Sequence, residues 1–152
     1  MMNQFERGAL DMSEKVFTAS VTAVGGREGR VESSNGVINM ELAMPNTPRA
    51  KEKPEATNPE QLFAAGYSAC FDGALQLMAR KERVKFESEV TANVSLLKDE
   101  TDDGFKLGVL LQVKGTGIEK DKLEELVHKA HEFCPYSKAT RGNIEVELEV
   151  VE

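Results

Sequence analysis

One helical segment without a polar face constrains the fold of this chain more than any other feature. It begins at Asn58, a favourable N-cap, with Pro59 at the first helical position, and it ends in the charged run Arg80–Arg83. Small or apolar residues occupy almost every side of this helix, so it must be buried on most sides. The residues at helical spacing that predict its inward face are Leu62, Gly66, Ala69, Cys70, Gly73 and Leu77.

The residues before this helix predict a three-stranded antiparallel unit. The predicted strands are Val16–Val24, Arg30–Ser34 and Val37–Met44. Gly25–Gly29 forms the first turn, and the Asn35-Gly36 pair predicts a type I′ turn, in which both central residues have positive φ. The proline-bearing stretch Pro45–Thr57 predicts a solvated loop that connects the strands to the helix.

The residues after the helix predict a second hairpin, a second helix and a last strand. The expected elements are strands over Val84–Val94 and Phe105–Val113, a helix from Leu123 to Cys134 that Pro135 ends, and a strand over Ile144–Val150. The order is βββ-α-ββ-α-β. Because the strands come in antiparallel groups, this order predicts an α+β fold with antiparallel sheets around two central helices.

Length and helix character together predict a homodimer. The chain has 152 residues, which fits one domain, and we assign residues 16–152 to it and residues 1–15 to an N-terminal extension. Two small sheets can hardly enclose a helix that is apolar all round. A second copy of the chain is therefore expected to cover part of it.

Charge and apolar content exclude several classes of partner. The 26 acidic and 19 basic residues give a net charge of −7, which repels nucleic acid and anionic lipid. No stretch has the length of a membrane span, and charges interrupt the first 13 residues where a signal peptide would be apolar. We therefore expect a cytoplasmic protein. In that reducing compartment its two cysteines could be inert thiols, metal ligands or a transient redox pair.

Cys70 lies inside the first helix, and Cys134 lies at the end of the second, against Pro135. As buried small hydrophobes both cysteines would need no further explanation. The place of Cys134, where the chain changes direction, favours a redox role. A thiol among apolar groups ionises with difficulty, so a reactive cysteine would need a cation nearby.

A metal site is the third alternative for the cysteines. His128, His131 and Cys134 are spaced three apart, and Cys70 could be a fourth ligand. This spacing is weakly specific, because steps of three walk around a helix and no paired Cys-x-x-Cys or His-Glu-x-x-His accompanies them. Arg27 and Glu60 also have ordinary explanations, as a solvated turn charge and as an acid in the first turn of a helix.

Three motifs, taken together, resemble one protein family. They are Gly25-Gly26-Arg27-Glu28-Gly29, the run from Asn58 to Phe71, and Cys134-Pro135-Tyr136-Ser137 followed by Ala139–Ile144. Their residues and order, over Val16 to Glu152, are similar to the organic hydroperoxide resistance proteins of bacteria, a branch of the Ohr/OsmC family. Tyr136 and the Gly-Gly-Arg turn favour this branch over the osmotically induced OsmC branch.

The resemblance implies a thiol peroxidase that works without metal, flavin or other cofactor. It implies intertwined homodimers with active sites at the subunit interface. Carried over to this chain, it makes Cys70 the peroxidatic thiol and Cys134 the resolving thiol, with Arg27 and Glu60 as the polar pair beside the peroxidatic sulfur. Arg27 would stabilise the thiolate and orient the peroxide, and Glu60 would hold the guanidinium.

The implied reaction reduces organic hydroperoxides, alkyl or fatty-acid, through a Cys70 sulfenic acid and a Cys70–Cys134 disulfide. The resemblance names lipoylated protein, rather than thioredoxin, as the dithiol reductant. An apolar wall from Tyr67, Phe71, Met78 and other neighbours on the helix is expected to favour alkyl groups. The alternatives are an OsmC-type general stress peroxidase, a non-enzymatic dimer that binds an apolar ligand, and a redox sensor, which the charge and the lack of a DNA-binding motif disfavour.

Overall fold

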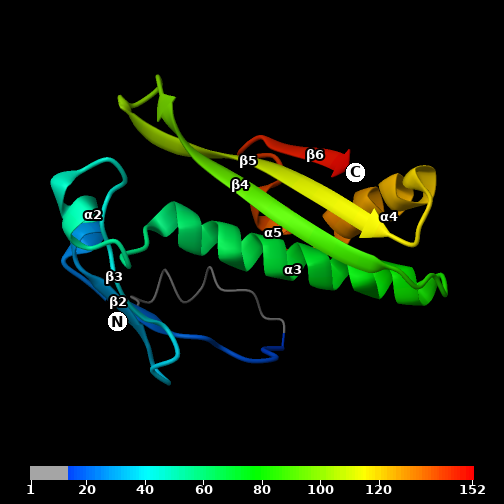
Figure 1. Ribbon diagram of the computed structural model, residues 1–152, viewed down its shortest axis with the longest axis horizontal. Helices are drawn as coiled ribbons and strands as arrows, with labels where there is room; N and C mark the ends of the chain where they lie inside the picture. Colours follow the sequence, from blue (N-terminus) through cyan, green and yellow to red (C-terminus); the bar gives the residue numbers. More distant parts are fainter. Residues whose placement is uncertain (1–13) are drawn as a thin grey trace. The chain divides into compact units, whose positions relative to one another are not determined.

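Residues 14–152 are described by a computed structural model, in which the chain divides at Ala56 and Thr57 into two units that we describe separately (Figure 1). The predicted extension, residues 1–15, lies outside the described residues except for its last two positions. The assignment of residues 16–152 to one peroxidase domain stays a prediction.

The N-terminal unit contains the predicted three-stranded antiparallel sheet, in the order β1-β2-β3. Its strands are β1 (Val21–Val24), β2 (Arg30–Ser33) and β3 (Asn39–Glu41), all shorter than the sequence predicts. Between β1 and β2 the 3-10 helix η1 (Gly26–Glu28) makes the turn. Gly25 and Gly26 have φ values of 83° and 62°, a left-handed conformation that favours glycine.

The turn at Asn35-Gly36 is not type I′, contrary to the prediction. Gly36 has a φ of 75°, but Asn35 is not among the non-glycine residues with positive φ. The Gly36 amide donates to the Ser33 carbonyl at 2.9 Å, and the Asn35 side chain accepts from the Val37 amide at 3.1 Å. One residue in the left-handed conformation therefore suffices, because the asparagine side chain itself completes the turn.

The connector before the long helix is also not a simple loop. It contains the short helix α2 (Pro48–Glu52), whose first turn is capped by Thr47, with the Ala50 amide donating to Thr47 Oγ1 at 3.3 Å. Proline at the first helical position starts a helix as readily as it interrupts a strand. The short helix was not predicted, because the prolines were interpreted only as residues that interrupt regular structure.

The C-terminal unit begins with the long helix α3 (Pro59–Lys81), as predicted. The side chain of Asn58 caps it by accepting from the Gln61 amide at 2.8 Å. The predicted inward face was wrong by about one residue, since Ala69 and Gly73 are exposed. The residues that this chain buries are Tyr67, Phe71, Ala74, Leu75, Met78 and Ala79.

A three-stranded sheet, in the order β4-β5-β6, covers α3 on one side. The predicted hairpin is confirmed by antiparallel pairing of β4 (Glu87–Asp99) with β5 (Gly104–Thr116). The last strand, β6 (Val146–Val151), runs parallel to β5, so the expectation of antiparallel sheets was wrong here. Helices between β5 and β6 carry the chain back along the sheet, and such a crossover makes the two strands parallel.

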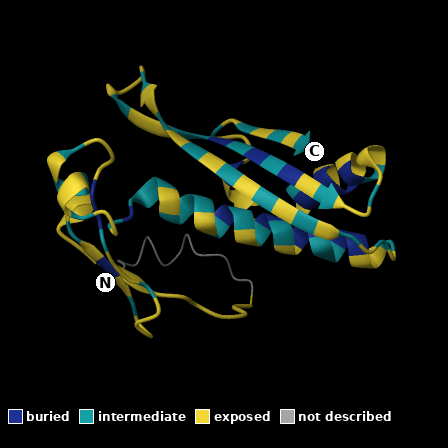
Figure 2. Ribbon diagram, viewed as in Figure 1, coloured by how far each residue is buried: buried dark blue, intermediate teal, exposed yellow. Residues whose placement is uncertain are grey.

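Two helices fill that crossover. The predicted second helix is α4 (Lys120–Phe133), and α5 (Pro135–Thr140) follows it without having been predicted. The core lies between the helices and one face of the sheet (Figure 2). With α2 and α5 added, the α+β class and the βββ-α-ββ-α-β order are confirmed.

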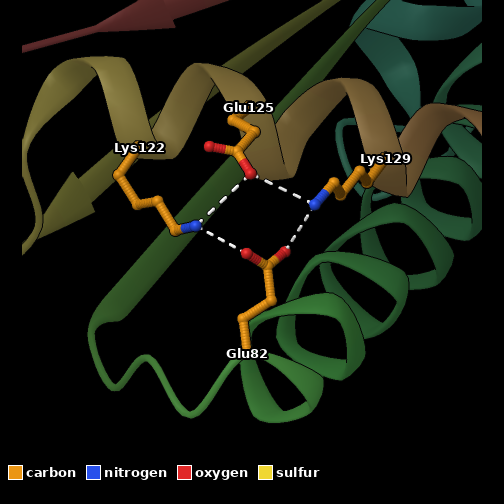
Figure 3. Close-up of polar contacts among 4 residues, drawn as sticks. All are labelled: Glu82, Lys122, Glu125 and Lys129. Carbon is orange, nitrogen blue, oxygen red and sulfur yellow. Dashed lines mark hydrogen bonds and ion pairs between the residues drawn. The ribbon is translucent and has the colours of Figure 1, made fainter.

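A ring of four charges joins the end of α3 to α4 (Figure 3). Lys122 Nζ lies 2.5 Å from Glu82 and 3.3 Å from Glu125, and Lys129 Nζ lies 2.9 Å and 3.1 Å from the same two carboxylates. Each charge therefore has two opposite neighbours. The ring stands at the end of α3 away from Asn58.

Candidate active site

The two cysteines meet inside the C-terminal unit. Cys70 lies in the middle of α3 and Cys134 at the junction of α4 and α5, and their Sγ atoms are 3.7 Å apart. Cys134 is completely buried, whereas Cys70 is partly exposed. Both are free thiols in this structure. The more exposed of the two cysteines is thus Cys70, to which the family resemblance assigns the attack on peroxide.

The backbone holds Cys134 at a sharp change of direction. It closes α4 and opens α5, with φ −60° and ψ 127°, outside the helical region. Its amide donates to the Ala130 carbonyl at 2.7 Å, and its carbonyl accepts from the Lys138 amide at 2.9 Å. Pro135 has no backbone N–H that could continue the hydrogen bonds of α4, which explains why the helix ends before this residue.

Burial raises the pKa of the Cys70 thiol, because a thiolate loses solvation among apolar neighbours. A hydrogen bond from the backbone amide of Tyr136 works in the opposite direction and lowers the pKa, while the neighbouring Cys134 raises it further. The net shift is upward, so the C-terminal unit by itself favours the neutral thiol. The hydrogen bond from the Tyr136 amide to Cys70 was not predicted from the sequence, although amides in the first turn of a helix that begins at Pro135 have no intrahelical partners.

The geometry of the two sulfurs suits disulfide formation. A disulfide bond is about 2 Å long, so the sulfurs would have to approach by about 1.7 Å. A hinge residue between two helices can supply a movement of that size without disturbing either helix. Two facing thiols can therefore act as a reversible redox pair once an oxidant converts one of them to a sulfenic acid.

A buried chain of polar side chains lies behind this junction, and the sequence analysis missed it. Tyr67 Oη lies 2.8 Å from Ser137 Oγ and 3.3 Å from Thr140 Oγ1, and His131 Nδ1 lies 2.9 Å from Ser137 Oγ. Tyr67 and Ser137 are wholly buried. Burial lowers the pKa of His131, and the nearby charges of Arg141 and His128 lower it further. The sequence signal for this chain was the helical spacing of Ser137 and Thr140, polar residues three positions apart.

A cavity of about 620 Å³ opens beside Tyr136. Its lining residues are Phe63, Lys106, Leu107, Pro135, Tyr136, Ala139, Thr140, Asn143 and Ile144. The aromatic rings of Phe63 and Tyr136 meet edge to face, with centroids 6.0 Å apart. Of the helix residues expected to form an apolar wall, Tyr67, Phe71 and Met78 belong to the core, whereas their helix neighbour Phe63 lines this cavity. The role of such a wall in binding a peroxide stays a prediction.

Gly66 allows the Tyr136 ring to lie against α3. A Cβ atom at this position would stand 2.9 Å from Cζ of the Tyr136 ring, closer than real contacts allow. The absence of a side chain at Gly66 thus fixes where Tyr136 lies. That ring forms part of the cavity wall, and the amide of the same residue faces Cys70.

Comparison with known proteins places this arrangement in a family. The family model described as OsmC-like protein matches residues 51–149. This chain belongs to the OsmC-like family. Within it the chain falls in the organic hydroperoxide resistance branch, as the sequence resemblance indicates.

Several relatives of the branch cover almost the whole chain. The organic hydroperoxide resistance protein OhrA of Bacillus subtilis (strain 168) is 70% identical over 93% of this chain and 100% of its own length. The crystal structure of Bacillus subtilis OhrB matches with a TM-score of 0.86 at 52% identity, covering 90% of this chain and 100% of that one. A Vibrio cholerae relative, solved with captopril bound in one of its active sites, matches with a TM-score of 0.79 at 38% identity over 92% and 95% of the two chains.

The other two predicted site residues of this OsmC-like protein lie in different units. Arg27 is in η1 of the N-terminal unit, and Glu60 is in the first turn of α3 in the C-terminal unit. Neither side chain is without an interaction partner. Their assignment to the Cys70 site stays a prediction.

Over residues 14–152 the structure contains no group of three or more His, Cys, Asp or Glu residues that could hold a metal ion. His131 Nδ1, one of the ligands in the alternative metal reading, is engaged with Ser137. Among the same residues, no helix combines the length and apolar character needed to cross a bilayer.

Proposed function

We propose that this protein reduces organic hydroperoxides to alcohols with Cys70 as the peroxidatic thiol and Cys134 as the resolving thiol. The observation that carries the proposal is the 3.7 Å separation of a partly exposed and a buried free thiol. Relatives named for organic hydroperoxide resistance support the substrate class and a peroxidase-like function.

The reaction proceeds in three steps. The Cys70 thiolate attacks the terminal peroxide oxygen, the O–O bond breaks, and the alkoxide takes a proton and leaves as the alcohol. Cys70 is then a sulfenic acid. The Cys134 thiol attacks its sulfur, a disulfide forms and water leaves. A dithiol reductant exchanges with this disulfide and returns both cysteines to thiols.

The first step requires the Cys70 thiolate, which its surroundings in the C-terminal unit disfavour. We assign to Arg27 the cation that offsets this, because a guanidinium stabilises a thiolate and can donate to a peroxide oxygen. Glu60 would hold that guanidinium through a charge-assisted hydrogen bond. A carboxylate close to the sulfur by itself would only oppose ionisation.

The cavity beside Tyr136 supports an organic rather than an inorganic peroxide. Most of its lining is apolar, and a volume of about 620 Å³ exceeds what hydrogen peroxide needs. Burial of an alkyl group adds binding free energy that hydrogen peroxide cannot supply. We therefore assign alkyl or fatty-acid hydroperoxides as the substrates, with this cavity as the candidate site of their alkyl groups.

Three further assignments belong to the proposal. The working form is an intertwined homodimer, supported by the exposed small residues Ala69 and Gly73 of α3, which a second copy would cover. The reductant is a dithiol, which the family resemblance names as lipoylated protein. The protein acts in the cytoplasm, where free thiols persist.

A dimer that binds an apolar ligand without chemistry is the second candidate, and the apolar cavity favours it. Turnover separates the two. With cumene hydroperoxide and dihydrolipoamide, a peroxidase consumes peroxide catalytically, and Cys70→Ser abolishes this consumption because a hydroxyl is far less ionisable and nucleophilic than a thiol. Intact mass after one equivalent of peroxide should show a loss of two hydrogens in the parent. Undiminished turnover by Cys70→Ser would refute the proposed mechanism.

A further inference from the structure

We infer that the buried chain Tyr67–Ser137–His131 positions Cys134 for attack on oxidised Cys70, and so sets the rate of disulfide formation without acting on the peroxide. The inference rests on the proposed function. Among the described residues, Tyr67, Ser137 and His131 hydrogen-bond to one another and not to either sulfur. They are positioning residues, and the evidence for them is the path of contacts between the two cysteine-bearing segments.

The position of Cys134 depends on the angle between α4 and α5. Cys134 is the one residue between these helices, so any rotation of α5 against α4 moves its sulfur. Two side-chain contacts span the junction. His131 Nδ1 on α4 meets Ser137 Oγ on α5 at 2.9 Å, and Arg141 Nη2 donates to the His131 carbonyl at 2.6 Å.

A further contact ties this junction to the helix of Cys70. Tyr67 stands three residues before Cys70 on α3, so the two side chains leave neighbouring positions of one helix surface. Its hydroxyl reaches Ser137 at 2.8 Å. A chain of two hydrogen bonds thus runs from α3 through α5 to α4, and it links the carriers of both sulfurs independently of the sulfurs themselves.

The hydroxyl hydrogens fit a directed chain. Thr140 Oγ1 donates to the Ser137 carbonyl at 3.2 Å, so its hydrogen is not available to Tyr67. With neutral His131 accepting at Nδ1, Ser137 donates to the imidazole and Tyr67 donates to Ser137. Since Tyr67 and Ser137 are wholly buried, water cannot take the place of either hydroxyl in the hydrogen bond between them.

A serine hydrogen-bonded to a histidine also has the form of a hydrolase nucleophile and its base. Ser137 does not fit that role, because its side chain is fully buried and already has two side-chain partners. Fixing the geometry of the junction is the use that its surroundings permit.

The inference predicts a separation of the two oxidative steps. Attack of Cys134 on the sulfenic acid requires an approach of about 1.7 Å, and small errors of position are costly in such reactions. Attack of Cys70 on peroxide needs no movement of Cys134. The Tyr136 amide that hydrogen-bonds to Cys70 also belongs to α5, so loss of the Tyr67 hydroxyl should slow disulfide formation much more than Cys70 oxidation.

The test follows both steps in one turnover of the full-length protein with one equivalent of cumene hydroperoxide. Stopped flow measures Cys70 oxidation, and acid quench with thiol alkylation and intact mass measures the disulfide. In Tyr67→Phe, which keeps the ring, we expect disulfide formation to be slower by about tenfold and Cys70 oxidation to change by no more than about twofold. Ser137→Ala should behave in the same way, and the double variant should be no slower than the worse single variant.

Ser88→Ala is the matched control. Ser88 is a part-buried hydroxyl that accepts from Gln76 Nε2 at 2.6 Å and donates to Asp72, which joins β4 to α3 and not to α5. It should leave both steps unchanged. Dimedone should trap more sulfenic acid in Tyr67→Phe than in this control, because the intermediate lives longer.

Equal disulfide rates in the parent and Tyr67→Phe would overturn the inference and leave the proposed function intact. Equal slowing of both steps would also overturn it, since that would indicate a general loss of structure. A parent protein that forms no Cys70–Cys134 disulfide would refute the proposed function, and the inference with it. Should Ser137→Ala not fold, Tyr67→Phe decides alone.

Discussion

The Sγ atoms of Cys70 and Cys134 lie 3.7 Å apart although 64 residues separate the two in the chain. Their exposure differs, since Cys134 is fully buried and Cys70 is not. Cys70 is therefore the more accessible of the two residues. This difference sets the order of events in the proposed cycle, with oxidation at Cys70 first and resolution by Cys134 second.

Replacement of Arg27 should change how the rate of Cys70 oxidation depends on pH. The surroundings of Cys70 in the C-terminal unit raise its pKa, and we propose that Arg27 offsets this. In Arg27→Ala the thiolate fraction at neutral pH falls, so the rate of oxidation should fall by about tenfold or more and its pH profile should move to higher pH. Stopped-flow oxidation rates over a range of pH give the measurement.

Arg30→Ala is the control for this variant. Arg30 is a neighbouring arginine on β2 that lies 3.5 Å from Glu41, and its loss should leave the pH profile of oxidation in place. A folded Arg27→Ala protein with the parent profile would remove Arg27 from the mechanism.

Most of the fold could be predicted because it depends on local patterns. The Asn58 cap, the alternation in β4 and β5 and the Pro135 break each act within a few residues, and each is confirmed. The parallel pairing of β5 with β6 depends instead on where a crossover returns the chain. No local period in the sequence of β6 carries that information.

The candidate site was predictable in part. Resemblance identified the cysteines, and their proximity agrees with it. The Tyr136 amide beside Cys70 and the Tyr67–Ser137–His131 chain were missed, because a backbone amide has no sequence signature and the hydroxyls meet only after α3 and α5 have packed. The buried face of α3 was misplaced because small residues on all its sides leave the hydrophobic period ambiguous.

The ring of charges between α3 and α4 should contribute little to stability, and its contribution should depend on salt. The pKa of Glu82 is lowered by hydrogen bonds from Lys122 and then Lys129. Because these charges are exposed, Glu82→Gln should lower the melting temperature by only about 1 to 2 °C in dilute buffer. The difference should disappear in concentrated salt. Glu124→Gln, at an exposed carboxylate of α4 outside the ring, is the control, and a large loss in high salt would contradict this account.

His131 should make stability depend on pH. Burial holds the pKa of His131 in the native protein below its ordinary value of about 6.5. At a pH between the lowered pKa of the native protein and the ordinary pKa of the unfolded chain, the unfolded chain binds more protons than the native state. Stability therefore rises with pH in that interval and is lost as pH falls through it. His131→Asn, which keeps an acceptor near the position of Nδ1, should flatten this part of the profile in urea titrations. His128→Asn should retain most of it, because burial, the main cause of the lowered His131 pKa, is unchanged.

Cys134→Ser tests the division of labour between the two thiols. If Cys134 only resolves the sulfenic acid, the variant should still reduce one equivalent of organic hydroperoxide per Cys70 in a single turnover, because the attacking sulfur is still present. Without a thiol within reach, the sulfenic acid persists, and excess peroxide should convert it to sulfinic and sulfonic acid. Activity should then decay during an assay that contains reductant. Intact mass should show a loss of two hydrogens in the parent and a gain of oxygens in the variant. A Cys134→Ser protein that fails in its first turnover, as Cys70→Ser is expected to do, would mean that Cys134 takes part in the attack on peroxide.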